Sequence, residues 1–236
     1  MNIKFKHEKS VENLFKDSFE QAARNKDYIY TSASLDSQDR LVGADYLFTD
    51  HTQYAIIEFK YREGDLPSEV KKKKRLELCN ALYQQKNIRP LHDKCHFAAW
   101  SDASNKITIE TNIYFNEVCN ESFWGDAFKH VAFPDKTTRK EQNDFIDSFI
   151  DGEEGGSFAD FNQYMKWLLN LGDQTNTNGY LELLISNPLD RRATGLAFTS
   201  IENMQKWVVN NKKTPSMNNS KNNKRGGPSG SGGKFS

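Results

Sequence analysis

The sequence predicts an α/β fold in which a mixed β-sheet is flanked by helices, and three patterns in the first hundred residues support it. An amphipathic helix is expected over residues 10–25. Two apolar, strand-like segments follow at 41–48 and 53–61, and a second helical stripe then precedes a short apolar strand at 95–100. Helices that alternate with strands in this way are typical of sheets covered on both faces. Beyond this core we expect an α+β C-terminal extension.

The composition favours a folded chain in an aqueous compartment. Of the 236 residues, 36% are apolar and 12% are aromatic, which supplies bulky side chains for a core. The mean hydropathy is −0.79, and no apolar run approaches the roughly 20 residues that span a bilayer, so we expect no membrane partner. Residues 1–7 are charged and lack the apolar segment of a secretory signal. We therefore expect a cytoplasmic protein.

Cysteine usage agrees with that location. Cys79, Cys95 and Cys119 are odd in number and widely spaced. A disulfide framework is normally denser and even-numbered, so we expect three reduced thiols.

The first expected helix has an apolar face that carries an acidic residue. Val11, Phe15 and Phe19 recur at four-residue steps and define that face. Glu12 lies beside Val11 and therefore points near the buried side of the helix, which is an unusual place for a carboxylate. This position makes Glu12 a candidate functional residue.

The two strongest strand candidates form a hairpin that brings charged residues together. A polar turn at 49–52 separates them, after a shorter aromatic-rich strand at 28–34. If the hairpin is symmetric about the bond between the third and fourth turn residues, Asp45 faces Glu58. Side chains alternate in direction along a strand, so Lys60 shares a face with Glu58. The apolar hairpin would then end in two carboxylates and one ammonium group.

Two carboxylates at the end of this hairpin would be most stable around a cation. Adjacent carboxylates repel each other, and a buried charge is costly unless it is paired or bound to a metal. Lys60 can neutralise one of them, whereas a divalent cation would satisfy both. Ligation by oxygen alone favours Mg²⁺ or Mn²⁺, so we expect Asp45 and Glu58 to be metal ligands. Such an ion can polarise a phosphoryl oxygen and lower the pKa of bound water, which Lys60 would orient.

Together these residues resemble the PD-(D/E)xK nuclease superfamily. The shared features are a helix bearing Glu, a strand bearing Asp, and Glu-x-Lys on the next strand, followed by a helix and another strand. The resemblance covers about residues 8–100 and implies a restriction-endonuclease-like αβββαβ core with a central mixed sheet. The catalytic residues that it implies are Glu12, Asp45, Glu58 and Lys60.

The resemblance also implies an activity. Members of this superfamily are metal-dependent nucleases, so we expect hydrolysis of DNA, favoured over RNA, in restriction, repair or antiviral (phage) defence, and the chain is compatible with a homodimer. Ala44 stands where the name-giving proline would be, at a position that varies in this superfamily. Glu8 or Glu20 could take the place of Glu12, although Glu12 lies closer to the apolar face of the expected helix.

Two other interpretations of the same residues stay open. A catalytically inactive module with this fold could bind nucleic acid or a protein partner. Alternatively, Asp45, Glu58 and Lys60 could form an ordinary solvated ion-pair cluster at a strand end.

A run of five cations at residues 71–75 falls in the helix expected over 68–85. Cations beside a metal site can bind a phosphate backbone, although most charge runs are solvated helix faces. Consecutive helical residues point in different directions, so only two or three of them could face one ligand. The expected nucleic-acid contacts are Lys71, Lys72, Lys74 and Arg75.

The sequence after residue 106 predicts further strands and helices. A strand is expected over 107–118. Helices are expected over 140–150, 158–171 and 201–210, and a hairpin is expected between 180–186 and 193–199.

These elements suggest three regions. They are a nuclease-like core at 1–133, an α+β extension or second subdomain at 134–210, and a disordered basic tail at 211–236. The tail has six basic residues and no acidic one, whereas the rest of the chain has 26 basic and 32 acidic residues. The tail is either a weak nucleic-acid tether or simply a solvated end.

Overall fold

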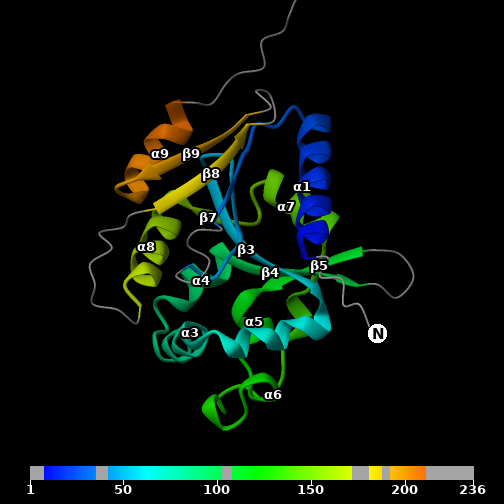
Figure 1. The fold of residues 1–236 in the computed structure, drawn as a ribbon, viewed down its shortest axis with the longest axis vertical. Coiled ribbons are helices and arrows are strands. Elements are labelled where there is room, and N and C mark those ends of the chain that lie inside the picture. Colours follow the sequence, from blue (N-terminus) through cyan, green and yellow to red (C-terminus); the bar gives the residue numbers. More distant parts are fainter. Residues whose placement is uncertain (1–7, 36–41, 103–107, 172–180, 188–191, 211–236) are drawn as a thin grey trace, which may run out of the picture.

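The computed structural model describes residues 8–35, 42–102, 108–171, 181–187 and 192–210. Within these residues the strands form one nine-stranded sheet (Figure 1). Its order is β6-β5-β4-β3-β2-β1-β8-β9, and β7 pairs with β3 outside this path. The strands are β1 (Thr31–Ser34), β2 (Tyr46–Thr49), β3 (Gln53–Arg62), β4 (His96–Asp102), β5 (Thr108–Ile113), β6 (Lys140–Glu141), β7 (Gly156–Ser157), β8 (Leu181–Asn187) and β9 (Arg192–Phe198).

Helices cover both faces of this sheet (Figure 1). The α-helices are α1 (Glu8–Asn25), α3 (Lys73–Gln84), α4 (Arg89–Cys95), α5 (Tyr114–Val118), α6 (Glu121–Trp124), α7 (Gln142–Ile150), α8 (Phe158–Leu169) and α9 (Ile201–Asn210). Short 3₁₀ segments are η1 (Glu63–Lys71), η2 (Gly125–Ala127) and η3 (Lys136–Thr138). One core joins α1 and α7 to the sheet, and a second core joins α3, α4, α5, α8 and α9 to it.

The sheet is mixed, as the sequence predicts. The β1–β2, β2–β3 and β4–β5 pairs are antiparallel, whereas β3 and β4 run parallel. The parallel pair needs a crossover connection, which η1, α3 and α4 provide. The α/β prediction with a mixed sheet flanked by helices is therefore confirmed.

The predicted apolar face of the first helix is confirmed. Val11, Phe15 and Phe19 are buried on the side of α1 that packs against the sheet. Phe15 meets Phe48 and Phe59 edge-on, with ring centroids 5.5 and 5.4 Å apart. These aromatic contacts fix α1 across the β2–β3 hairpin, because offset and edge-to-face rings pack favourably.

The hairpin has the predicted register. Tyr46 pairs with Ile57 and Phe48 pairs with Ala55, as symmetry about the bond between residues 51 and 52 requires. The Asp50 carboxylate closes the turn by accepting the backbone N–H groups of Thr52 and Gln53, both at 2.7 Å. This Asx-type turn sets the pairing of every residue that follows.

Several element boundaries differ from the prediction. The strands expected over 28–34 and 41–48 begin only at Thr31 and Tyr46. The helix expected over 68–85 is interrupted at Lys72, whose backbone is extended (φ −97°, ψ 100°) between η1 and α3. The strand expected over 107–118 ends at Ile113, and α5 follows because Tyr114 and Val118 are buried at helical spacing. A short apolar run does not distinguish a strand from a buried helix.

The expectation of three reduced thiols is wrong for two of them. Cys79 of α3 and Cys119, which follows α5, form a disulfide, with Cα atoms 5.2 Å apart. Cys95 is a buried free thiol. The pairing depends on where α3 and α5 pack, which cysteine spacing alone does not reveal.

The predicted C-terminal elements are present. The helices expected over 140–150, 158–171 and 201–210 correspond to α7, α8 and α9, and β8 and β9 form the expected hairpin. Because β8 pairs with β1, this hairpin extends the same sheet. The expected tail at 211–236 lies outside the described residues. In the part of the chain that is described, no helix combines the length and apolarity needed to cross a bilayer.

Candidate metal centre

The hairpin brings Asp45 and Glu58 together, as predicted. Asp45 lies one residue before β2, and its backbone N–H donates to the Ile57 carbonyl at 2.9 Å. Its Oδ2 accepts the backbone N–H of Phe59 at 2.6 Å. These two bonds hold Asp45 against β3, and a carboxylate oxygen of Asp45 lies within 4.8 Å of one of Glu58.

A third carboxylate joins this pair. Glu8, Asp45 and Glu58 each offer one carboxylate oxygen, and the three oxygens lie within 4.8 Å of one another. Glu58 is only 1% exposed, and among the described residues its Oε2 has no hydrogen-bond partner. A buried carboxylate oxygen without a partner is costly, so the arrangement fits a bound cation that these oxygens would coordinate.

The acidic residue of α1 in this group is Glu8, the alternative named above, and not Glu12. Glu12 is buried as expected, but Lys9 holds both of its carboxylate oxygens, at 2.7 and 2.9 Å. Glu8 lies one helical turn earlier, and its Oε1 is 3.4 Å from the Lys60 ammonium. The prediction of Glu12 as the helix-borne site residue is therefore corrected to Glu8.

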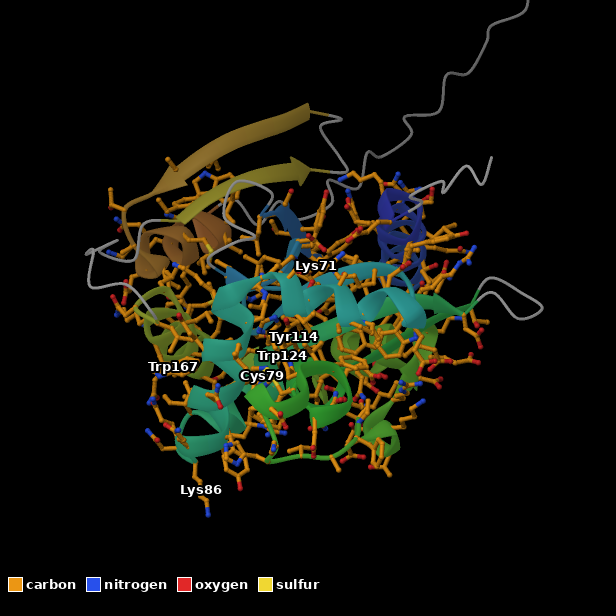
Figure 2. The ribbon with its side chains drawn as sticks, turned by 60° about the horizontal axis from the view of Figure 1, so that its bottom comes forward. Lys71, Cys79, Lys86, Tyr114, Trp124 and Trp167 are labelled. Carbon is orange, nitrogen blue, oxygen red and sulfur yellow. A yellow bond between two sulfur atoms is a disulfide. The ribbon has the colours of Figure 1, made fainter. Side chains whose placement is uncertain are left out.

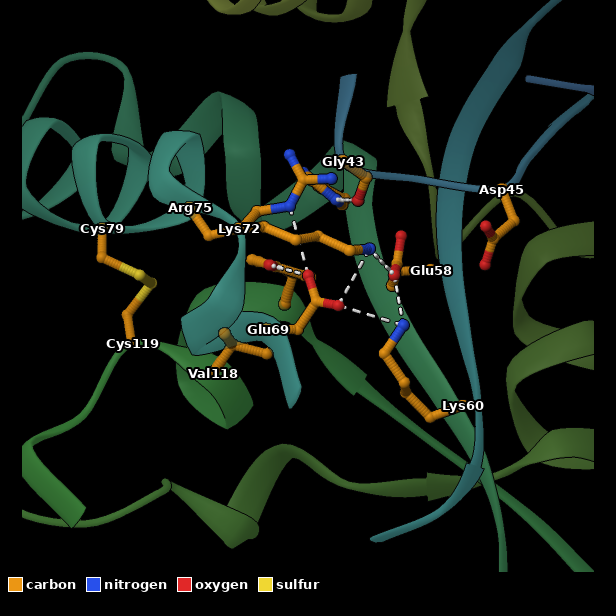
Figure 3. Close-up of polar contacts among 12 residues, drawn as sticks. Gly43, Asp45, Glu58, Lys60, Glu69, Lys72, Arg75, Cys79, Val118 and Cys119 are labelled. Atoms are coloured by element: carbon orange, nitrogen blue, oxygen red, sulfur yellow. Dashed lines mark hydrogen bonds and ion pairs between the residues drawn. A yellow bond between two sulfur atoms is a disulfide. The ribbon is translucent and has the colours of Figure 1, made fainter. Parts of the chain in front are cut away.

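Lys60 lies among carboxylates, on the same face of β3 as Glu58. Its ammonium forms ion pairs with Glu58 and with Glu69, the latter at 3.0 Å (Figure 3), and a third with Glu8. Burial by itself would lower the pKa of Lys60, but these three carboxylates raise it above its ordinary value. Lys60 is therefore a fixed cation rather than a base.

Asp45 differs from Lys60 in that its surroundings favour the neutral form of the side chain over the charged form. Burial, followed by repulsion from Glu58, raises the pKa of Asp45 from 3.8 to about 8, although Lys60 and the Phe59 N–H oppose this shift. Burial also raises the pKa of Glu58, against the lowering effect of Lys60. Without a further cation, the site therefore resists full ionisation.

Glu69, in η1, is a site residue that the sequence analysis missed. It is fully buried, and its partners are Lys60 and Lys72, both at 3.0 Å, and Arg75 at 3.1 Å. Burial alone would raise the pKa of Glu69, but these three cations lower it well below its ordinary value. No periodicity marks this residue, because it reaches the site only through the crossover that follows β3.

The basic run is divided between the surface and this network. Lys71 is exposed (Figure 2), and Lys74 is half-buried. The Lys72 ammonium is 2.8 Å from Glu58 Oε1 and also binds Glu69. Arg75 is 1% exposed and bound to Glu69, which corrects the expectation that it contacts nucleic acid. The remaining nucleic-acid contacts stay predictions.

The donor chemistry of the site fits Mg²⁺ or Mn²⁺. All three candidate ligands are carboxylates, which hard divalent cations prefer. Glu8 is half-exposed, so one side of the group is open to water, which Mg²⁺ characteristically keeps in its coordination shell. A cation here would offset the burial and the repulsion from Glu58 that together hold the pKa of Asp45 high.

Comparison with protein-family models, with curated proteins and with solved structures found no match to this chain.

Proposed function

We propose that this chain is a metal-dependent nuclease that hydrolyses DNA phosphodiester bonds, with a site of the PD-(D/E)xK type. The observation that carries the proposal is the buried Oε2 of Glu58, which has no hydrogen-bond partner in the part of the chain that the structure describes; it lies beside the Asp45 and Glu8 carboxylates, with an ammonium on the same strand face. The element order supports it: α1, β1, β2 and β3 are followed by a helical crossover (η1, α3 and α4) and then β4, which matches an αβββαβ core whose second helix is replaced by several helical segments.

The residues divide the chemistry between them. Asp45, Glu58 and Glu8 would hold Mg²⁺ or Mn²⁺, which supplies a Lewis acid for a phosphoryl oxygen and lowers the pKa of bound water. Lys60 stays protonated beside its carboxylate partners, so it would orient the attacking water or stabilise charge that develops on the phosphate. A protonated Asp45 must lose its proton before it can act as a ligand.

One observation favours the alternative of a catalytically inactive module that binds nucleic acid or a protein partner. Lys60 and the half-buried Lys72 already pair with Glu58 and Glu69, so these two positive and two negative charges balance without a metal. A network satisfied in this way could be purely structural. The two functions differ in whether the chain cuts DNA.

Plasmid nicking in Mg²⁺ or Mn²⁺ separates them. Wild type should nick, and Asp45→Ala and Lys60→Ala should lose nicking while keeping the wild-type circular dichroism spectrum. Lys86→Ala is the matched control, because Lys86 is exposed (Figure 2) and belongs neither to the candidate metal centre nor to the predicted nucleic-acid contacts. Equal nicking in all four proteins would falsify the assignment.

The other outcomes are also informative. Salt-sensitive retardation of DNA without nicking in any of the proteins would favour the binding module. A protein that neither nicks nor retards DNA would contradict both functions. An RNA substrate of the same sequence, tested in parallel, checks the preference for DNA.

A further inference from the structure

Glu69 connects the candidate metal centre to the buried interior between α3 and α5. Its Oε1 is 3.0 Å from the ammonium groups of both Lys60 and Lys72. Its Oε2 accepts Arg75 Nε at 3.1 Å and the Tyr114 hydroxyl at 2.9 Å. Figure 3 shows this carboxylate between the Arg75 side chain and the two lysines. Each oxygen of Glu69 thus has a separate set of partners.

The two lysines that Glu69 holds act on one oxygen of Glu58. Lys60 donates to Glu58 Oε1, and Lys72 donates to the same atom at 2.8 Å. Glu58 Oε2 is left buried and without a hydrogen-bond partner among the described residues. Figure 3 places the Glu58 carboxylate between these ammonium groups and Asp45. The lysines therefore fix how the Glu58 carboxylate is rotated.

We propose that Glu69 is a positioning residue of the metal centre. By anchoring Lys60 and Lys72, it keeps both ammonium groups on Oε1 of Glu58 and reserves Oε2 for the cation. Glu69 belongs to a second layer around the ligands and does not itself bind the cation. Outer partners of this kind orient metal ligands and tune their strength. This inference rests on the proposed function, because it presupposes a cation at Glu58.

Loss of the Glu69 carboxylate should weaken cation binding in two ways, through the orientation of Glu58 and through the net charge of the site. Removing the Glu69 charge leaves Lys60 and Lys72 with fewer carboxylates to share, so both draw more strongly on Glu58. The site also becomes more positive by one unit, which disfavours a divalent cation. Both effects weaken cation binding. A carboxylate that only stabilised the fold would not change the affinity of the folded protein for metal.

The chain contains a closely matched control residue. Glu117 of α5 is also fully buried, and it pairs with Arg139 and accepts the Asn112 side-chain amide at 2.8 Å. Glu69 and Glu117 therefore each bind one arginine and one neutral donor, but the lysine contacts to Glu58 involve Glu69 and not Glu117. Glu117→Gln reproduces the general effect of losing a buried carboxylate charge.

The test is Mn²⁺ titration of the full-length protein by isothermal calorimetry, with thermal unfolding measured on the same samples. Glu69→Gln should bind Mn²⁺ about tenfold more weakly than wild type, within the range found for outer-shell changes. Glu117→Gln should bind Mn²⁺ like wild type. The double variant Glu69→Gln/Arg75→Met keeps the net charge of wild type and leaves no buried guanidinium without its partner, so it should keep the part of the weakening that comes from lost orientation and bind Mn²⁺ more weakly than wild type.

The outcomes separate this inference from the proposed function. Wild-type affinity in a folded Glu69→Gln protein, or in the folded double variant, would overturn the positioning role and leave the metal centre intact. Equal weakening in Glu117→Gln would also overturn it, because the effect would then be general. Failure of both Glu69 variants to fold would show a structural role instead. Wild type that binds no Mn²⁺ would contradict the metal centre itself.

Discussion

At the scale of single residues, Asp45 is the candidate metal ligand whose protonation state has the clearest consequence for binding. Burial and the neighbouring Glu58 raise the pKa of Asp45 to about 8, so the cation-free protein holds a proton there at neutral pH. The groups that face it are Glu58, Lys60 and Glu8. A divalent cation must displace that proton, so cation binding and pH are linked.

We therefore expect Mn²⁺ to bind more tightly as the pH rises. The apparent Kd should fall by about tenfold per pH unit between pH 6 and 8, because one proton is released, and should level off above the pKa of Asp45. Calorimetry at four pH values from 6 to 9 measures this. Asp45→Asn should bind more weakly with little pH dependence, and a wild-type Kd that is constant over this range would contradict the assignment of Asp45.

The same shift fixes the sign of a stability effect in EDTA. The folded protein keeps the Asp45 proton up to about pH 8, whereas the unfolded chain loses it near 3.8. The stabilising contribution is therefore complete below about pH 3.8 and is lost as the pH rises through about 8. Asp45→Asn should gain stability relative to wild type between pH 6 and 9, measured by thermal unfolding.

Gly43 permits the close approach of Arg75 to the strand that carries Asp45. Its φ is +81°, and a Cβ there would lie 2.6 Å from Arg75 Nη1. Gly43→Ala should lower the free energy of unfolding by about 1–3 kcal/mol, through backbone strain and displacement of the guanidinium. Urea denaturation measures the loss. Gly64→Ala is the control, because nothing lies within 4 Å of its Cβ, and an equal loss there would refute the explanation.

At the scale of elements, local rules predicted the part of the site that lies within one hairpin. Strand alternation and hairpin symmetry predict that Asp45, Glu58 and Lys60 lie together; the register confirms the symmetry of the hairpin, and the carboxylate cluster and the Lys60–Glu58 ion pair show that the three side chains are neighbours. Glu8 and Glu69 belong to a helix end and a crossover, so their positions depend on tertiary packing that sequence periodicity does not contain. For the same reason, the charge run gave no indication that Lys72 would turn inward to Glu58.

The disulfide between Cys79 and Cys119 is an element-scale constraint that joins α3 to the end of α5. It closes a segment with a sequence separation of 40 residues, and α3 carries Arg75 while α5 carries Tyr114, both partners of Glu69. A crosslink of this kind restricts the unfolded chain and holds these two helices together.

Replacing both cysteines should therefore destabilise the protein. Cys79→Ser/Cys119→Ser should lower the free energy of unfolding by about 2–4 kcal/mol relative to oxidised wild type. Guanidinium denaturation with and without dithiothreitol measures this. The reductant should bring wild type close to the double variant and leave the variant itself unchanged. Wild type that is insensitive to the reductant would show that the crosslink contributes nothing.

At the scale of the whole molecule, the order of the main elements was largely predictable, whereas the junctions between them and the long-range strand pairings were not. The mixed sheet was implied by the resemblance to a nuclease superfamily, and the pairing of β8 with β1 was not predicted. The flanking helices and the C-terminal hairpin follow from hydrophobic periodicity. The change from strand to helix after Ile113 and the interruption at Lys72 do not, because short apolar or charged runs fit either conformation.

Charge is unevenly distributed along the chain, which has a consequence for binding DNA. Residues 1–210 contain 26 basic and 32 acidic side chains, and residues 211–236 add six basic ones. If the tail tethers nucleic acid, a protein ending at residue 210 should bind DNA more weakly at low salt. The slope of log affinity against log salt should also shrink, by no more than about 5, which fluorescence anisotropy measures. An unchanged slope would show that the tail is a solvated end.

The central claim is that a divalent cation belongs between Asp45, Glu58 and Glu8. Anomalous diffraction from a crystal soaked in Mn²⁺ tests it most directly, with Asp45→Asn as the comparison. We expect an anomalous peak within bonding distance of Glu58 Oε2 and of an Asp45 oxygen, and a much weaker peak in the variant. A peak elsewhere, or no peak while Lys60 and Lys72 remain on Glu58, would contradict the account.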